Sequence, residues 1–378
     1  MANDRKYKEE VDEPTTSRDA ENLTRILLWN LAAEKVRDKE ISDKGETSEE
    51  KNLIFVGSRE SGKSSIILNY TDRSNETSKP TIALDYTFCR KAKSGSSVLK
   101  NVGHIFELGE GTFLLKLIDV VVNPENILNT SVIITVDLSK LSEMWITLET
   151  VIAYLKARIK ECVKEANRHD PTIKDQLKKA IQQRLSGNPD ESKLEPIALP
   201  TAIVASKYDI FEKYEPEKQK IISKTLRFVA HYFGASLIFS SNRNETSAIR
   251  LKSMMNNFLL DGSITRQAKI ETSKPIFVTF GADTFESIGL PPLSASELND
   301  PSHKTLLDLW KYLFCRHFPQ EESKKDPSLL EDFGRDPQFE ESSVDILREQ
   351  KMKELENLRE ILVKRRQNTQ TTSIQIIN

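Results

Sequence analysis

The sequence predicts an α/β protein built on a doubly wound, mostly parallel sheet, with helical extensions at its N- and C-terminal ends. Three observations carry this prediction. Short apolar strands alternate with helical segments over residues 51–290, a glycine-rich loop joins the first strand to the first helix, and amphipathic stretches flank this region. Such alternation is typical of parallel sheets because a parallel connection needs a crossover, usually a helix.

Composition excludes several classes of protein. The chain has 378 residues, 38% of them hydrophobic, and a formal net charge of −2. This length suits two average domains or one enlarged domain with tails. A nearly neutral chain creates no field that attracts nucleic acid nonspecifically, so nucleic acid is not an expected partner. The longest apolar runs have the length of strands, so no membrane span is expected.

The pattern of cysteines indicates the cellular compartment, and the pattern of histidines bears on metal binding. Cys89, Cys162 and Cys315 are odd in number and far apart, which favours a reducing compartment over a disulfide framework. The charged N-terminus lacks the apolar core of a signal peptide. The five histidines show no metal-ligand spacing with cysteines or carboxylates. We therefore expect a soluble, cytosolic protein.

The chain begins with a polar segment, residues 1–21, which is expected to be disordered. Residues 22–50 follow as an amphipathic helix and a charged linker, because Leu23, Ile26 and Leu27 recur at helical spacing. Packing of this helix on the next domain is favoured over a separate docking role.

Residues 51–290 form the predicted α/β domain. Strands are expected at residues 53–56, 82–90, 102–108, 114–121, 131–137, 202–205, 237–240 and 276–280. Helices are expected at residues 63–70, 142–166, 217–233 and 248–259. Residues 162–196 carry many charges and few apolar side chains, so we interpret them as an inserted helix and loop that projects into solvent.

Two helical segments follow the domain. Residues 291–320 contain a packing helix in which Trp310, Leu313 and Phe314 share one face. This face must cover either the domain or a partner, and the three residues are candidate partner contacts. Residues 321–378 are predicted to be a helical, partly disordered tail. Its candidate partner contacts are Leu347, Leu355 and Leu358, and a solvated tail is the alternative interpretation.

The strongest local signal is GSRESGKS, in which two glycines with four residues between them precede Lys63 and Ser64. The motif follows an apolar strand and opens a helix, as a phosphate-binding P-loop requires. Its backbone N–H groups would cradle the β-phosphate, Lys63 would neutralise phosphate oxygens, and the Ser64 hydroxyl would bind Mg²⁺. The phosphate-binding candidates are Gly57, Ser58, Arg59, Glu60, Ser61, Gly62, Lys63, Ser64 and Ser65. The predicted fold is therefore the P-loop NTPase fold of Ras-like GTPase type.

Two later strand ends carry candidates for reading a guanine base. The stretch SKYD is similar to the NKxD motif with serine in place of asparagine, and its aspartate would accept the N–H donors of guanine. The next strand ends in SSN, where GTPases make a short base contact. The candidates are Ser206, Lys207, Asp209, Ser240, Ser241 and Asn242. An ordinary exit from strand to loop is the alternative interpretation of SKYD.

The parts that hydrolyse GTP are degraded in this sequence. A GTPase has a DxxG turn, whereas this chain has Glu107 in the aspartate position and Glu110 in the glycine position, with no glutamine after them. Fast hydrolysis is therefore not expected, and no catalytic residue is assigned. The Mg²⁺ candidates are Ser64, Thr81 and Glu107, with a purely structural Thr81 as the alternative.

Together these motifs resemble one family closely, the light intermediate chains of cytoplasmic dynein, and in particular their dynein-2 form. The resemblance rests on VGSRESGKSSII, KPTIALDYTFCRK, FELGEG, the SKYD stretch and RDPQFEESSVDILREQK, and it runs from about residue 27 to about residue 353. The PTIALDYTF stretch and the ELGEG turn are its more specific parts, because many unrelated NTPases share a P-loop.

The resemblance implies a non-catalytic accessory subunit whose Ras-like domain binds the heavy-chain tail of the motor that drives retrograde intraflagellar transport. It also implies other dynein-2 subunits and the intraflagellar transport complex as partners. The implied locations are the cytoplasm and the cilium with its axoneme and basal body. Any GDP or GTP bound with Mg²⁺ would be structural rather than turned over, and an empty P-loop is the alternative.

A Ras-like switch protein that hydrolyses GTP slowly, or with assistance, is the alternative function. A switch requires that its GTP and GDP forms differ in affinity for a partner. The replacements at Glu107 and Glu110 favour the scaffold over the switch. A P-loop kinase of small substrates fits poorly, because the SKYD stretch would then have no purpose.

Overall fold

The computed structural model describes residues 50–92, 100–260, 262–271, 274–294, 297, 305–321 and 341–375. It divides into two compact units, residues 1–321 and 322–378. The predicted N-terminal segments, residues 1–21 and 22–50, lie outside the described residues apart from Glu50.

Within the described residues, the strands form one sheet in the order β2-β3-β1-β4-β5-β6-β8-β7. In chain order they are β1 (Glu50–Gly57), β2 (Leu84–Ala92), β3 (Lys100–Leu108), β4 (Thr130–Asp137), β5 (Thr201–Ser206), β6 (Ser236–Phe239), β7 (Ala268–Lys269) and β8 (Phe277–Val278). The strands from β3 across to β6 are parallel, whereas β2, β8 and β7 add antiparallel pairs at the two ends. The predicted mostly parallel sheet is confirmed.

The helices come from the connections between strands. They are α2 (Lys63–Tyr70), α3 (Ile118–Val121), α4 (Leu141–His169), α5 (Ile173–Leu185), α6 (Tyr208–Phe211), α7 (Pro216–Tyr232), α8 (Glu245–Leu259), α9 (Phe285–Ile288), α11 (Leu306–His317) and α12 (Ser342–Gln375), with 3-10 turns η1 (Leu115–Leu117), η2 (Ile127–Asn129) and η3 (Glu191–Lys193). The four predicted helices of the domain are all present, with small shifts at their ends. No helix in the described parts of the chain is long and apolar enough to cross a membrane.

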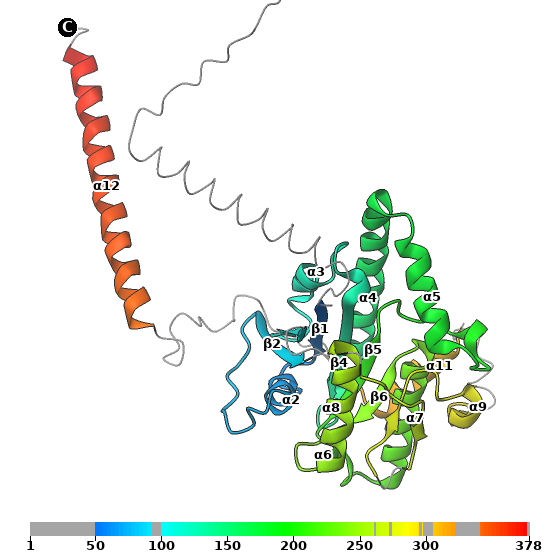
Figure 1. The fold of residues 1–378 in the computed structure, drawn as a ribbon. Coiled ribbons are helices and arrows are strands. Elements are labelled where there is room, and N and C mark those ends of the chain that lie inside the picture. The colour runs from blue at the N-terminus through cyan, green and yellow to red at the C-terminus, as the bar shows by residue number, and fades with distance from the viewer. Residues whose placement is uncertain are drawn as a thin grey trace, which may run out of the picture. The chain divides into compact units, whose positions relative to one another are not determined.

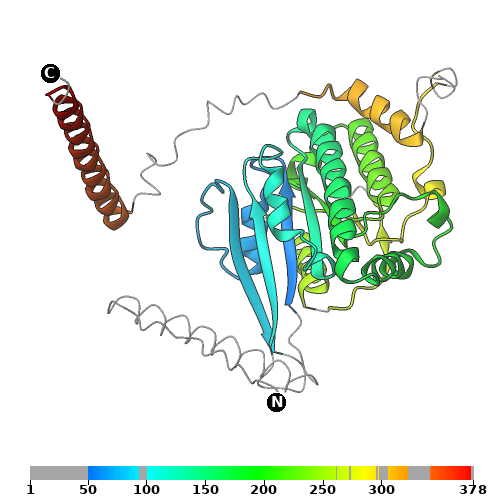
Figure 2. The same ribbon diagram turned by 90° about the horizontal axis from the view of Figure 1, so that it is seen from above.

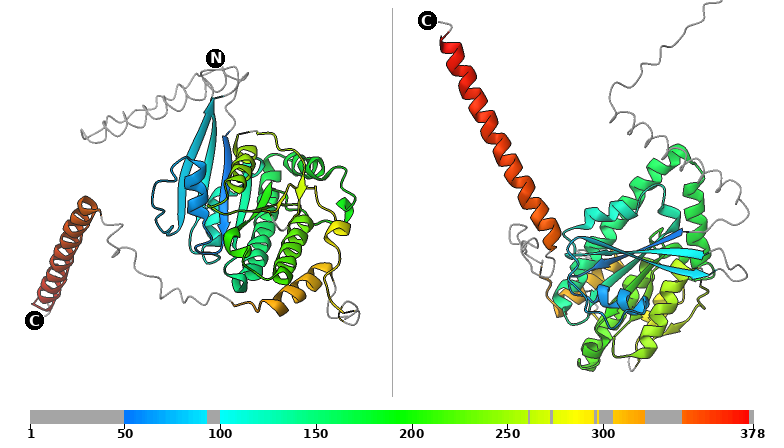
Figure 3. Two further views of the ribbon diagram at one scale, coloured as in Figure 1. Left: turned by 90° about the horizontal axis from the view of Figure 1, so that it is seen from below. Right: turned by 60° about the vertical axis from the view of Figure 1, so that its left-hand side comes forward.

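Two layers of helices enclose the sheet (Figures 1 and 2). On one face α2 and α8 pack against Leu53 and Phe55 of β1. On the other face α4, α7 and α11 pack against Ile54 and Val56 of the same strand. Because successive strand residues point to opposite faces, a strand covered on both sides must be apolar throughout. Figure 3 shows the strands between these layers from two further directions.

The prediction of a strand at residues 114–121 is wrong. These residues form η1 and α3, and Leu115, Ile118 and Val121 are buried at intervals of three residues. Composition alone does not distinguish a strand from a helix in an apolar run of this length. The spacing of the buried residues distinguishes them.

The inserted segment, residues 162–196, contains helix as predicted. The prediction that it projects into solvent is wrong, because one of its sides is buried. It contains the end of α4 and all of α5, whose Cys162, Ile173 and Leu177 are buried in the main core. The Cys162 thiol donates a hydrogen bond to the carbonyl of Val122 at 3.3 Å. The charged residues between these positions cover only the outer side of the segment.

The packing helix α11 joins the same core. Trp310, Leu313 and Phe314 have no exposed surface, and the Trp310 ring stacks on Phe228 of α7 with 5.5 Å between ring centroids. The prediction that these three side chains bind a partner is therefore wrong, because they cover the domain itself. In the described part of the second unit, Leu347, Leu355 and Leu358 of α12 are more than half exposed, so they remain candidate partner contacts.

A buried ion pair ties α7 to the segment before α9. Arg227 donates hydrogen bonds to the two carboxylate oxygens of Asp283 at 2.8 and 2.7 Å, and a third to the Ser287 hydroxyl. Both charged side chains are more than nine-tenths buried. Close by, His231 and Asp190 are hydrogen-bonded at 3.0 Å. These contacts join the inserted segment, α7 and α9.

The variant Arg227→Ala is expected to lower the free energy of unfolding by about 3–5 kcal/mol, because it leaves the Asp283 carboxylate buried without its charged partner. Denaturation in urea, followed by circular dichroism, measures the loss. Arg73→Ala is the control, because Arg73 and Glu76 form an exposed pair worth less than about 1 kcal/mol. Similar losses in the two variants would contradict the structural role of the buried pair.

Candidate nucleotide-binding site

The path of the loop after β1 is set by its close approach to β4. Gly57 has a φ of +142°, and a Cβ atom built on it would lie 1.9 Å from the carbonyl oxygen of Thr135. Only glycine fits at such a distance. Gly62, with a φ of +84°, has open space around it and turns the chain into α2. Gly57 therefore permits the close approach of the loop to β4, and Gly62 permits the turn of the chain into α2.

Lys63 places a buried positive charge over this loop. Its side chain is only 5% exposed, and its ammonium donates a hydrogen bond to the carbonyl of Ser58 at 2.8 Å. Burial lowers the pKa of Lys63, while the carboxylates of Glu107 and Glu110 act to raise it. An ammonium held above the backbone N–H groups of such a loop is a suitable counter-ion for phosphate.

The three predicted Mg²⁺ ligands lie together near the end of β3. The Ser64 hydroxyl donates a hydrogen bond to the Glu107 carboxylate at 2.7 Å, and Thr81 lines the same cleft as that carboxylate. Burial raises the pKa of Glu107, and the Ser64 hydrogen bond and the Lys63 charge oppose that rise. Hydroxyl and carboxylate oxygens are the ligands that Mg²⁺ prefers, so these residues fit the ion.

Glu110 belongs to this site as well, although the sequence prediction did not include it. Its φ of +52° lies in the region that favours glycine. Its side chain is buried and pairs with the Arg59 guanidinium at 3.6 Å. The motif identifies Glu110 as a replaced glycine, but only the fold shows that its carboxylate lies beside the P-loop. Two buried carboxylates therefore accompany the cations Lys63 and Arg59.

These groups line a cleft of about 340 Å³ between the P-loop, residues 78–81 and the turn after β3. Every predicted phosphate-binding residue from Arg59 to Ser65 lines it, while Gly57 and Ser58 are buried behind them. Neither glutamine nor histidine is among the described residues of the cleft wall. In the described chain, histidine, cysteine and carboxylate side chains form no cluster that could hold another metal. The lining therefore carries groups whose chemistry suits phosphate, and its described residues include no side chain of the kind that usually orients a hydrolytic water.

Two of the predicted base-reading residues are brought together. The Ser241 hydroxyl donates a hydrogen bond to the Asp209 carboxylate at 2.8 Å, and the Arg243 guanidinium lies 3.8 Å from the same carboxylate. The backbone supports this contact, since the N–H of Tyr208 donates to the carbonyl of Ser240 at 3.0 Å.

The other two residues of SKYD contact the end of β4 instead. The Ser206 hydroxyl donates a hydrogen bond to the carbonyl of Val136 at 3.1 Å. The Lys207 ammonium pairs with the fully buried carboxylate of Asp137, and Lys207 has a φ of +59°. Sequence reasoning missed Asp137, because an aspartate at the end of a strand carries no motif of its own.

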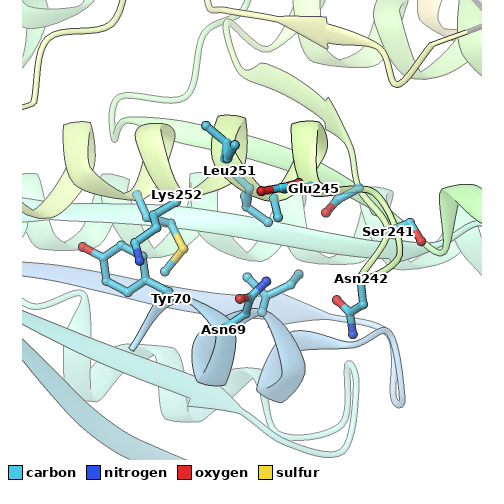
Figure 4. Close-up of a pocket in the computed structure, with 12 residues that line it drawn as sticks. Asn69, Tyr70, Ser241, Asn242, Glu245, Leu251 and Lys252 are labelled. Carbon is cyan, nitrogen blue, oxygen red and sulfur yellow. The ribbon is translucent and has the colours of Figure 1, made fainter. Parts of the chain in front are cut away.

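A second, smaller pocket lies between α2 and α8 (Figure 4). It measures about 190 Å³ and is lined by Asn69 and Tyr70 of α2, Lys252 of α8, and residues 240–242. It shares no lining residue with the phosphate cleft. Ser240, Ser241 and Asn242 thus line a pocket that is separate from the phosphate cleft.

The strand order, the loop between β1 and α2 and the adjoining cleft define a P-loop domain of the Ras-like type. No family model matches the sequence. The chain is 35% identical over 337 residues to cytoplasmic dynein 2 light intermediate chain 1 of Mus musculus, a match that covers 87% of this chain and 94% of the relative. The protein of the same name from Homo sapiens is 35% identical over 335 residues, with the same coverage. The chain therefore belongs to the cytoplasmic dynein-2 light intermediate chain family.

A solved structure supports the fold. The conserved domain of a dynein light intermediate chain aligns with a TM-score of 0.51 and 18% sequence identity, over 74% of this chain and all of that domain. At this identity the similarity concerns the fold alone.

Gly57→Ala is expected to lower the free energy of unfolding by more than about 3 kcal/mol, because the new methyl group meets the backbone of β4 in an unfavourable conformation. Gly62→Ala is the matched control. Its backbone is also left-handed but its surroundings are open, so we expect a loss of about 1–2 kcal/mol. Urea denaturation of both variants measures the difference, and equal losses would contradict a contact role for Gly57.

Glu107→Gln tests the buried carboxylate. Because burial raises its pKa, Glu107 stabilises the folded chain fully only below its ordinary pKa of 4.5, and this contribution is lost as the pH rises through the raised value. The variant should therefore have a higher free energy of unfolding than the wild type at neutral pH, without nucleotide or Mg²⁺. The gain should disappear below pH 4.5. Denaturant titrations at both pH values measure it, and a gain independent of pH would exclude ionisation as its cause.

Proposed function

We propose that the chain is a non-catalytic accessory subunit of the cytoplasmic dynein-2 motor. The observation that carries this proposal is its match, over most of its length, to chains named cytoplasmic dynein 2 light intermediate chain 1. In this role the P-loop domain binds the heavy-chain tail and associates with other dynein-2 subunits and the intraflagellar transport complex. The subunit supports retrograde intraflagellar transport along ciliary microtubules, and with it cilium assembly and ciliary length.

The proposed locations follow from this role: the cytoplasm, and the cilium with its axoneme and basal body. The described structure supports two kinds of contact with partners. The P-loop domain has a continuous core that includes α11, so it can act as a rigid body. The exposed Leu347, Leu355 and Leu358 of α12 offer apolar contacts to a partner helix.

A structural nucleotide suits the cleft. GDP or GTP with Mg²⁺ would join α2, residues 78–81 and the end of β3, through Ser64, Thr81 and Glu107. Bound nucleotide would stabilise the folded chain by mass action without being hydrolysed. Structural binding therefore needs no turnover.

One observation favours a second candidate function, a Ras-like GTP-binding switch with slow or assisted hydrolysis. Ser64 and Thr81 belong to different segments but line the same cleft as Glu107, to which Ser64 donates a hydrogen bond. A bound Mg²⁺ ion would therefore link the P-loop helix to the segment before β2. A switch would additionally require GTP and GDP to bind two conformations with different affinities.

Lys63→Ala separates these two functions. As a scaffold, the full-length variant purified from ciliated cells is expected to recover as much dynein-2 heavy chain as the wild type, measured by mass spectrometry of the co-purifying proteins. Its melting temperature is expected to fall if bound nucleotide stabilises the domain. Lys218→Ala is the matched control, because Lys218 forms an exposed ion pair with Glu215.

Each outcome of this experiment decides between proposals. Equal recovery of heavy chain by all three proteins supports the scaffold. Loss with Lys63→Ala alone, in a variant that still unfolds cooperatively, supports the switch. If the wild-type chain recovers no dynein heavy chain, the proposed subunit role is wrong.

A further inference from the structure

The turn after β3, residues 109–111, forms part of the wall of the phosphate cleft. Gly109 and Glu110 line the cleft, and all three residues of the turn are buried. In GTPase switches, the segments beside the γ-phosphate are ordered by that phosphate and are released when it is hydrolysed. A switch and a scaffold therefore differ in what holds this turn in place.

Backbone contacts join the turn to the segment that precedes β2. The N–H of Gly109 donates a hydrogen bond to the carbonyl of Ala83 at 2.7 Å. A Cβ atom built on Gly109 would lie 2.1 Å from the carbonyl oxygen of Thr81, so only glycine permits this approach. The turn and the segment that carries Thr81 therefore contact each other through groups of the chain itself.

A side-chain contact joins the same turn to the P-loop. The Glu110 carboxylate, with a side chain only 7% exposed, lies 3.6 Å from the Arg59 guanidinium, whose side chain is 35% exposed. A Cβ atom built on Gly111 would lie 3.5 Å from the backbone nitrogen of Arg59, so the two backbones also touch. Lys63 is the other cation close to Glu110, but its ammonium donates to the carbonyl of Ser58. Arg59 is therefore the cation that pairs with Glu110.

We propose that Arg59 and Glu110 are positioning residues, whose ion pair holds the turn against the P-loop in place of the γ-phosphate of a nucleotide. Glu110 stands in the glycine position of the DxxG turn, where a GTPase has a backbone N–H that contacts the γ-phosphate. Here a carboxylate bound by a P-loop guanidinium closes the same gap. The turn then keeps one position with GDP, with GTP or with an empty cleft, whereas a switch needs two positions. Only the part of the proposal that concerns nucleotide rests on the proposed function.

The backbone at Glu110 supports this role. Its φ of +52° is followed by a φ of +64° at Gly111, so two left-handed residues form the turn. Glycine adopts this conformation without strain, whereas glutamate does not. A strained residue persists when surrounding contacts compensate for the strain. The contact of the Glu110 side chain with Arg59 provides that compensation.

Hydrogen exchange of the full-length chain, followed by mass spectrometry, tests the proposal. Any nucleotide is first removed with EDTA and alkaline phosphatase. The readout is a peptide that covers residues 109–113, in which the N–H groups of Gly109 and Phe113 donate backbone hydrogen bonds. Arg59→Ala is expected to speed exchange in this peptide about tenfold, because it removes a charged partner of the turn.

Two further variants of the P-loop and its surroundings make this result specific. Lys140→Ala is the matched control, because Lys140 pairs with the next P-loop residue, Glu60, at 3.0 Å and does not contact the turn. It should leave exchange at residues 109–113 unchanged. Arg59→Lys keeps the positive charge, so it should retain most of the protection that Arg59→Ala loses.

The other half of the ion pair gives an independent test. Glu110→Asn removes the carboxylate, and asparagine tolerates a left-handed backbone better than most residues. It should speed exchange as much as Arg59→Ala does. The double variant Arg59→Ala, Glu110→Asn should exchange no faster than either single variant, because both remove the same contact.

Nucleotide then separates a fixed turn from a switch. With Mg²⁺ and either GDP or a non-hydrolysable GTP analogue, exchange at residues 109–113 of the wild type should agree within about twofold, because the ion pair holds one conformation. In Glu110→Asn the GTP analogue should slow exchange more than GDP does, because the γ-phosphate can then order the released turn.

Several outcomes would overturn the proposal. These are equal exchange in Arg59→Ala and Lys140→Ala, additive effects in the double variant, and a wild-type turn that the GTP analogue protects but GDP does not. If Arg59→Ala or Glu110→Asn does not unfold cooperatively on heating, the other variant decides. Calorimetry that detects binding of neither nucleotide would refute the proposed structural nucleotide, while exchange in the nucleotide-free chain would still decide the role of the ion pair.

Discussion

The contact between Gly57 and β4 is the constraint on which the site depends. β1 runs between β3 and β4 in the middle of the sheet and is apolar on both faces, so its position is fixed by packing from two layers. The chain can leave this strand toward the cleft only because Gly57 passes the carbonyl of Thr135 without a side chain. The positions of Lys63 and Ser64 at the start of α2 follow from that exit.

Charge compensation governs what the cleft can do. Lys63 is buried beside two carboxylates, and the pKa values of Lys63 and Glu107 both move toward the neutral forms because water is excluded. A bound divalent cation would reverse that effect at Glu107, since a nearby positive charge favours the carboxylate. An ionised Glu107 therefore costs stability in the free domain, and a bound cation would offset that cost.

The sequence allowed prediction of those features that depend on neighbours along the chain. The strand, loop and helix around Lys63 are local, and so the motif placed them correctly. The carboxylate of Glu110 and the pairing of Lys207 with Asp137 depend on which strands lie side by side, so the motif could not place them. The same reason explains the error at Trp310. Its helical spacing showed that it must be buried, but only the tertiary structure shows that α7 covers it.

Strand β3 contributes Glu107 to the phosphate cleft and also pairs with the edge strand β2. Along β3, Glu107 points to the cleft, while Phe106 and His104, on the other face, contact Tyr86. β2 and β3 are paired over nine positions without interruption, from Leu84 to Ala92. In a continuous antiparallel ladder each strand fixes the position of the other, because moving one strand alone would break many hydrogen bonds together. A ligand at Glu107 would therefore steady the edge strand without changing its register, as expected for a nucleotide that serves a scaffold.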